Sequence, residues 1–153
     1  MKVNYRSTRR AVFNLTVQIV LVTKYRRQVI NAEMMTELET VFESVLKSWD
    51  SELIEFNGES DHVHLLISYP PHKLLSSLIA NLKATSSKAI WRKFERGGRW
   101  GLPSMSNHVV ESIVSNTYQR RVFWTGAYFV ASCGGVTIDV LKKYVQEQDS
   151  SNC

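Results

Sequence analysis

The segment 61–67 reads DHVHLLI and decides how the rest of the chain is interpreted. Successive side chains of a strand point to opposite faces of a sheet. His62 and His64 therefore share one face, and the apolar residues that alternate with them share the other. The apolar set predicts a face packed against a core, whereas the histidine pair predicts an open face. We therefore expect residues 62–69 to form a strand in a sheet that is covered on one side.

The sequence before this segment predicts a strand, a helix and a second strand. Residues 13–22 alternate between apolar and polar side chains and then become apolar on both faces, which is typical of a strand entering a core. Asn31 can cap a helix. Its apolar positions step by three and four residues and are Met35, Leu38, Phe42, Val45 and Trp49. Residues 52–57 predict a strand that pairs with 62–69 across the turn 58–61.

The sequence after this segment predicts a second long helix over 73–94, ended by the glycines at 97 and 98. Residues 97–121 also contain Gly101 and Pro103, which favour a loop, although 108–117 could form a short helix. Residues 122–132 are rich in aromatic and β-branched side chains and predict the last long strand. A glycine pair at 134–135 then breaks the chain before a final helix over 137–148.

This order of elements predicts an α+β fold, a ferredoxin-like βαββαβ antiparallel sheet with helices on one face, plus a C-terminal helix. At 153 residues, one domain is expected. We place it at 13–148, after a basic N-terminal arm at 1–12 and before a C-terminal tail at 149–153. The open face of the sheet is left for a site.

The composition restricts the class of protein. No stretch approaches the roughly 20 uninterrupted apolar residues of a membrane span, and no secretory cleavage site follows the N-terminus, so a soluble cytoplasmic protein is expected. The two cysteines have no metal-site spacing. The 19 basic residues exceed the 14 acidic ones and give a formal charge of +5. That charge attracts polyanions, although it is also common among other cytosolic proteins.

Two groups of side chains carry candidate chemistry. The imidazoles of His62 and His64 offer two nitrogen ligands to a divalent cation, which can still take oxygen ligands from elsewhere. A solvent-facing or hydrogen-bonded pair is the alternative interpretation. On the final helix, Tyr144 and Gln148 are four residues apart and share a face. A tyrosine becomes a nucleophile when a metal or base favours its phenolate. On the local pattern alone, a surface tyrosine and a solvated glutamine at a helix end are the more common interpretation.

The chain resembles the single-tyrosine HUH transposases of bacterial insertion sequences, the TnpA type of the REP-associated tyrosine transposase superfamily. The resemblance is carried by HVH at 62–64, KYRR at 24–27, and Tyr144 followed by Gln148 after the glycine pair. Further pieces are LKATSSK at 82–88 and FWTGAYF at 123–129. Residues 97–121 depart from the family pattern because this connection is longer than usual.

The resemblance implies a function and a site. It implies that His62, His64 and Gln148 hold Mg²⁺ or Mn²⁺, and that Tyr144 is the catalytic residue. Tyr144 would attack single-stranded DNA with hairpin ends and leave a 5′-phosphotyrosine and a free 3′-OH. The resemblance also implies a homodimer in which Tyr144 acts in trans.

Basic and aromatic side chains outside these motifs predict where DNA binds. The candidates are Lys24, Tyr25, Arg26, Arg27, Lys83 and Lys88. The cations would neutralise phosphates and the tyrosine would stack on an unpaired base. Two other functions stay open on the residues alone. A non-catalytic RRM-like nucleic-acid-binding module has the same order of elements, and a metal-dependent phosphoesterase would use water in place of tyrosine.

Overall fold

The computed structural model describes residues 5–94, 122–132, 145 and 146. The strands are β1 (Arg6–Ser7), β2 (Val12–Phe13), β3 (Thr16–Val22), β4 (Glu52–Gly58), β5 (His62–Ser68) and β6 (Phe129–Ser132). The helices are the 3₁₀-helix η1 (Lys24–Arg26) and the α-helices α1 (Ala32–Ser48) and α2 (Leu75–Phe94).

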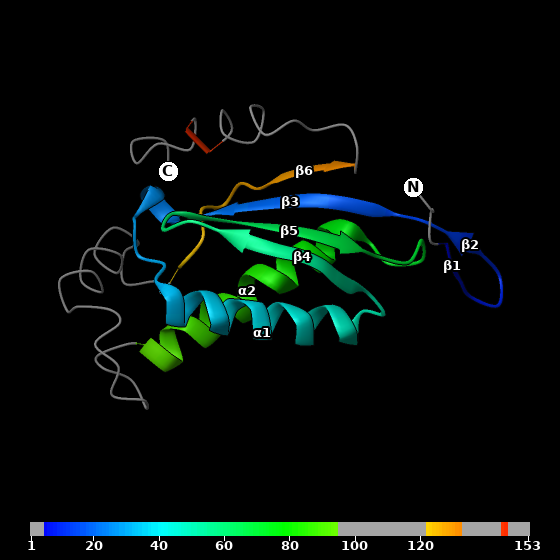
Figure 1. The fold of residues 1–153 in the computed structure, drawn as a ribbon, viewed down its shortest axis with the longest axis horizontal. Helices are drawn as coiled ribbons and strands as arrows, with labels where there is room; N and C mark the ends of the chain where they lie inside the picture. Colours follow the sequence, from blue (N-terminus) through cyan, green and yellow to red (C-terminus); the bar gives the residue numbers. More distant parts are fainter. Residues whose placement is uncertain (1–4, 95–121, 133–144, 147–153) are drawn as a thin grey trace.

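The main sheet has the strand order β4-β5-β3-β6, and every neighbouring pair is antiparallel. Helices α1 and α2 both cover one face of this sheet (Figure 1). The predicted α+β fold, a ferredoxin-like βαββαβ sheet with helices on one face, is therefore confirmed. Of the final helix expected over 137–148, only Val145 and Gln146 are described, and both are helical.

Helix α1 begins where the sequence predicts. The side chain of Asn31 accepts a hydrogen bond from the backbone N–H of Met34 at 2.9 Å, which satisfies one donor of the first turn. The buried stripe of the helix is displaced slightly from the predicted one. Met34 and Leu46 are fully buried, whereas Met35 and Trp49, at the two edges of the predicted stripe, are only partly buried. Met34, Leu38, Phe42 and Leu46 follow one another at intervals of four residues. This row of side chains lies closest to the sheet.

The two faces of β5 are divided as its period predicts. Val63, Leu65 and Ile67 belong to the core between the sheet and the two helices. The opposite face carries a small apolar cluster of Val20, Val22 and Val145. Residues 145–146, red in Figure 1, therefore pack on the face that the helices leave open. In the described part of the chain, no helix combines the length and hydropathy that a membrane span requires.

The strand predicted over 122–132 is shorter in the structure, where only Phe129–Ser132 pairs as β6. Phe123, Trp124 and Thr125 are consecutive and all buried, which is incompatible with the alternation of a half-covered strand. The backbone N–H of Thr125 donates to the carbonyl of Val22 at 2.8 Å, so this segment closes over the end of β3. Residues 97–121 lie outside the described part of the chain.

The described part of the predicted N-terminal arm is structured. Strands β1 and β2 form a hairpin, with Arg6 paired to Phe13. The Arg6 guanidinium donates to the Ser68 hydroxyl at 3.1 Å and to the Asp50 carbonyl at 2.6 Å. The hairpin is thus anchored to the end of β5, whereas the sequence indicated only a polar, basic lead-in.

Candidate active site

The two histidines of β5 lie side by side on the open face of the sheet. His62 pairs across the strands with Val22, and His64 pairs with Val20. Their ring centroids are 4.8 Å apart, with an interplanar angle of 74°. His62 is buried and His64 is half-buried. The shared face predicted for the pair from its two-residue spacing is confirmed.

The histidines line a cavity of about 600 Å³. It is bounded by side chains from β3, β4, β5, the β4–β5 turn, η1 and residues 145–146. These include Gln18, Arg26, Glu55, Asn57, Glu59, Asp61, Val145 and Gln146.

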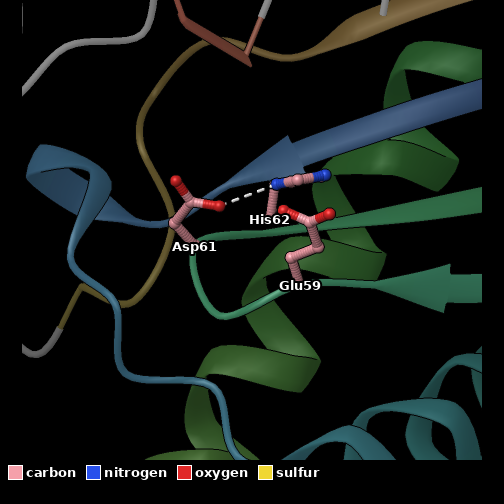
Figure 2. A group of neighbouring side chains, drawn as sticks. All are labelled: Glu59, Asp61 and His62. Carbon is pink, nitrogen blue, oxygen red and sulfur yellow. Dashed lines mark hydrogen bonds and ion pairs between the residues drawn. The ribbon is translucent and has the colours of Figure 1, made fainter. Parts of the chain in front are cut away.

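The carboxylate of Asp61 lies between Arg26 and His62. One oxygen, Oδ1, is 2.7 Å from His62 Nδ1 (Figure 2), and the other, Oδ2, accepts a hydrogen bond from Arg26 Nε at 2.9 Å. Burial alone would raise the pKa of Asp61, but the hydrogen bonds from His62 and Arg26 outweigh it and hold that pKa below its ordinary value. An ionised Asp61 only accepts hydrogen bonds, so it fixes the proton of His62 on Nδ1 and leaves Nε2 free to bind a metal.

Glu59 adds a second carboxylate from the turn between β4 and β5. Ligand atoms of Glu59, Asp61 and His62 all lie within 4.8 Å of one another, so this group can hold a metal ion. Figure 2 shows the Glu59 carboxylate beside the His62 ring. Both oxygens of Asp61 already have partners, whereas the Glu59 carboxylate makes no hydrogen bond or ion pair within the described residues. Of the two carboxylates, that of Glu59 is therefore the one whose oxygens are available to bind a metal.

The electrostatic surroundings of His64 favour a neutral ring. Burial lowers its pKa below the ordinary value, the charge of His62 lowers it further, and the charge of Glu59 partly opposes them. A neutral imidazole is the form that donates a lone pair to a metal.

Residues 145–146 lie against this site from the open side of the sheet. Val145 packs with Val20 and Val22, the cross-strand neighbours of the two histidines. The guanidinium of Arg26 donates through one terminal nitrogen to the carbonyl of Gln146 at 3.4 Å. Residues 145–146 therefore contact β3 next to the histidines. They also contact Arg26, which is hydrogen-bonded to Asp61.

A basic and aromatic cluster lies around η1 and the N-terminal side of β6. Lys24 and Arg27 lie 5.3 and 5.8 Å from the ring centroid of Tyr25. Lys83 of α2 donates to the carbonyl of Gly126 at 3.1 Å and lies 5.9 Å from the Tyr128 ring. Burial, and to a lesser extent the charge of Lys24, lowers the pKa of Lys83. The cluster thus contains three cation–π pairs, built from the kinds of side chain that bind phosphates and bases.

Comparison with known proteins identifies the family. Residues 11–105 and 102–148 match the sequence profile of the family described as "Transposase IS200 like". The chain belongs to the IS200-like transposases. This confirms the family expected from the sequence, an enzyme of the single-tyrosine HUH transposase type.

Curated relatives agree with this membership. The transposase is 24% identical over 136 residues to the transposases for insertion sequence element IS200 of Salmonella typhimurium and Salmonella typhi. That alignment covers 89% of this chain and 78% of each relative. It is also 28% identical over 80 residues to the ISDra2 transposase of Deinococcus radiodurans, covering 52% of this chain and 57% of that protein.

Solved structures share the fold of the transposase. A Deinococcus radiodurans structure described as a transposase has a TM-score of 0.74 and 20% identity, covering 94% of this chain and 98% of that chain. A REP-associated tyrosine transposase bound to a REP hairpin has a TM-score of 0.50 and 13% identity, covering 92% and 68%. At these identities the two structures support the fold alone.

The structure brings some of the predicted site residues together. His62 and His64 share the cavity with Arg26, which is bound to Asp61, whereas Lys24, Tyr25, Arg27 and Lys83 belong to the basic cluster. Lys88 is exposed on α2 and makes none of these contacts. The predicted nucleophile Tyr144 and the predicted ligand Gln148 lie outside the described residues.

Sequence reasoning missed three residues of the transposase that lie beside these groups. Glu59 and Asp61 were assigned only to a turn, and Tyr128 only to a strand. The signal for the carboxylates was available, because both precede the histidine pair within three residues of His62. Tyr128 had no such signal, since its neighbour Lys83 belongs to α2 and is distant from it in the sequence.

Proposed function

We propose that this transposase cleaves and rejoins single-stranded DNA with hairpin ends, using Tyr144 as the nucleophile and a divalent metal ion held beside His62. One observation carries the proposal. The group of potential metal ligands on the open face lines the same cavity as Val145, the residue bonded to Tyr144. Because Val145 follows Tyr144 directly in the sequence, its place in this cavity supports the choice of Tyr144 as the nucleophile.

The residues present fit Mg²⁺ or Mn²⁺. His62 offers Nε2, His64 offers a neutral ring, and Glu59 offers carboxylate oxygens. Mn²⁺ accepts both imidazole nitrogen and carboxylate oxygen, and Mg²⁺ prefers oxygen, which Glu59 and the predicted ligand Gln148 would supply. When bound, such an ion polarises a phosphate oxygen and stabilises the charge that develops at phosphorus.

The proposed reaction is a pair of transesterifications. The phenol oxygen of Tyr144 bonds to phosphorus and gives up its proton to the solvent, the bond from phosphorus to the 3′ oxygen breaks, and the 3′ oxygen takes up a proton. A 5′-phosphotyrosine and a free 3′-OH result. Attack by a 3′-OH of another strand then reforms a phosphodiester and releases the tyrosine. One ester replaces another in each step, so no nucleotide cofactor is needed.

The basic and aromatic cluster supports DNA as the substrate. Lys24, Arg27 and Lys83 can neutralise phosphates, and Tyr25 provides a ring on which an unpaired base can stack. A structural neighbour was solved bound to a REP hairpin. We extend the binding of hairpin DNA to this chain.

The test uses labelled single-stranded DNA from the ends of the element that encodes the protein, with Mn²⁺. The parent should give a covalent protein–DNA adduct that survives denaturation. Tyr144→Phe should bind the DNA but form no adduct, and His62→Ala should neither bind Mn²⁺ nor cleave. Cleavage by Tyr144→Phe without an adduct would establish the water-using phosphoesterase instead. Binding without cleavage by the parent would establish a non-catalytic module of the RRM type.

A further inference from the structure

Arg26 is held in an uncommon backbone conformation. Tyr25 and Arg26 both have positive φ, 59° and 53°, a region that residues other than glycine seldom occupy. Backbone bonds hold the turn, from Arg26 N–H to the carbonyl of Thr23 at 2.8 Å and from Lys24 N–H to the carbonyl of Phe123 at 2.9 Å. Two consecutive residues of this kind persist only where the surroundings require them. The turn fixes the direction in which the Arg26 side chain leaves the backbone.

The guanidinium reaches the metal-binding face through Asp61. Arg26 Nε donates to one Asp61 oxygen at 2.9 Å, and the other oxygen contacts His62 Nδ1 at 2.7 Å. The Asp61 side chain is 9% exposed and that of Arg26 is 34% exposed. A charged hydrogen bond to a buried carboxylate strongly restricts the direction of that carboxylate. The direction of Asp61 in turn determines where His62 presents Nε2.

The same guanidinium also reaches the C-terminal segment. A terminal nitrogen donates to the carbonyl of Gln146 at 3.4 Å, next to Val145, which packs on the sheet. Arg26 thus joins two described parts of the chain that are 85 residues apart, at Asp61 and at Gln146.

We infer that Arg26 is a positioning residue that links the placement of residues 145–146 to the orientation of His62 through Asp61. The inference rests on the proposed metal site. This role takes the place of the phosphate contact that the basic run at 24–27 predicted for Arg26. Arg27, the next residue, has no such link within the described part of the chain and lies over the Tyr25 ring, so we assign the phosphate-binding role to it.

Arg26→Ala and Arg27→Ala form a matched pair for the test, since each removes one guanidinium from the same turn. Mn²⁺ affinity is measured by calorimetry without DNA, and affinity for hairpin DNA by fluorescence anisotropy in EDTA. Arg26→Ala should weaken Mn²⁺ binding by about ten- to a hundredfold, the range for residues that orient metal ligands. Its DNA affinity should stay within about twofold of the parent, and kcat should fall while KM for DNA is kept. Arg27→Ala should show the reverse pattern, with weaker DNA binding and unchanged Mn²⁺ affinity.

A double-mutant cycle with Asp61→Asn separates this role from general loss of structure. Arg26 and Asp61 act on His62 in sequence, so the double variant should bind Mn²⁺ no more weakly than the weaker of the two single variants. Arg26→Lys keeps the charge and should recover part of the affinity. The inference would be overturned if the double variant lost Mn²⁺ affinity by the product of the two single losses. It would also be overturned if Arg26→Ala kept normal Mn²⁺ affinity but bound DNA more weakly. If His62→Ala also kept normal Mn²⁺ affinity, the proposed metal site itself would be wrong.

Discussion

At the scale of single residues, His62 and His64 are equivalent in the sequence motif but differ in their surroundings. His62 contacts the Asp61 carboxylate, which fixes its tautomer. His64 has a half-buried ring whose pKa lies below the ordinary value. The two imidazoles therefore contribute to a metal site in different ways, one oriented by a carboxylate and the other kept neutral by burial.

The lowered pKa of His64 predicts a pH dependence of stability. Between the folded pKa and the ordinary value of 6.5, the unfolded chain binds this proton and the folded chain does not. Stability should therefore fall as the pH decreases from about 7.5 to 5, and His64→Gln should lose part of this dependence. Urea unfolding across that range measures it. His72→Gln, at an exposed position, is the control and should behave as the parent does. The same slope in His64→Gln as in the parent would contradict the prediction.

The two glutamates that line the cavity are expected to differ in their effect on Mn²⁺ binding. Glu59 lies in the group with His62, whereas Glu55 lies on β4 outside that group. Glu59→Gln removes a charged ligand and should weaken Mn²⁺ binding by at least about tenfold, as loss of even an outer-shell partner does. Glu55→Gln should leave Mn²⁺ binding nearly unchanged. Calorimetric titration of both variants compares them, and equal affinities would show that Glu59 is not a ligand.

At the scale of elements, the β4–β5 hairpin places Glu59, Asp61 and both histidines within six residues of the chain. Gly58 ends β4 and pairs with Val63. Because a strand and the turn before it carry all four side chains, their relative positions depend on the close approach of the two strands at Gly58. The hairpin is the element on which the site depends most.

Gly58→Ala should therefore destabilise the protein. A Cβ at this position would lie 2.5 Å from the carbonyl oxygen of His62 and 2.9 Å from Cα of Val63, and both are backbone atoms. The two strands would have to move apart to remove this overlap. We expect this to lower the free energy of unfolding by about 1–3 kcal/mol. Gly126→Ala is a control, because a Cβ there meets nothing within 4 Å. Its effect should stay within about 0.5 kcal/mol, as at other exposed positions. Equal urea midpoints for the two variants would contradict this account.

At the scale of the whole molecule, the described part of the C-terminal segment meets the open face of the sheet through Val145. Its side chain packs against Val20 and Val22 of β3. The same apolar pair on the sheet of a partner could receive Val145 of this chain. We therefore keep the proposal of a homodimer in which Tyr144 acts in trans.

Mixing two inactive variants tests this arrangement. His64→Ala and Tyr144→Phe are combined under conditions that allow subunits to exchange, and DNA cleavage is measured. In trans, the heterodimer has one site with both defects and one with neither, so cleavage should return. In cis, each site has one defect and cleavage stays absent. Differently tagged subunits verify the exchange, and verified exchange without cleavage would refute the trans assignment.

The sequence by itself determined the order of the elements, the cap of α1 and the shared face of His62 and His64. These features follow from periods of two and of about 3.6 residues and from capping chemistry, all of which act over a few neighbouring residues. The same local rules predicted a last strand that is too long. They do not account for the burial of all three consecutive residues Phe123, Trp124 and Thr125.

Only the tertiary structure decided which partners surround the histidine pair. Arg26 and Asp61 are 35 residues apart, and Arg26 and Gln146 are 120 residues apart. They meet because the strand order places β3 between β5 and β6, so the turn after β3 reaches the start of β5 (Figure 1). A basic run at 24–27 is compatible with phosphate binding or with an ion pair. The choice depends on whether a buried carboxylate lies within reach, and strand pairing over long sequence separations determines that.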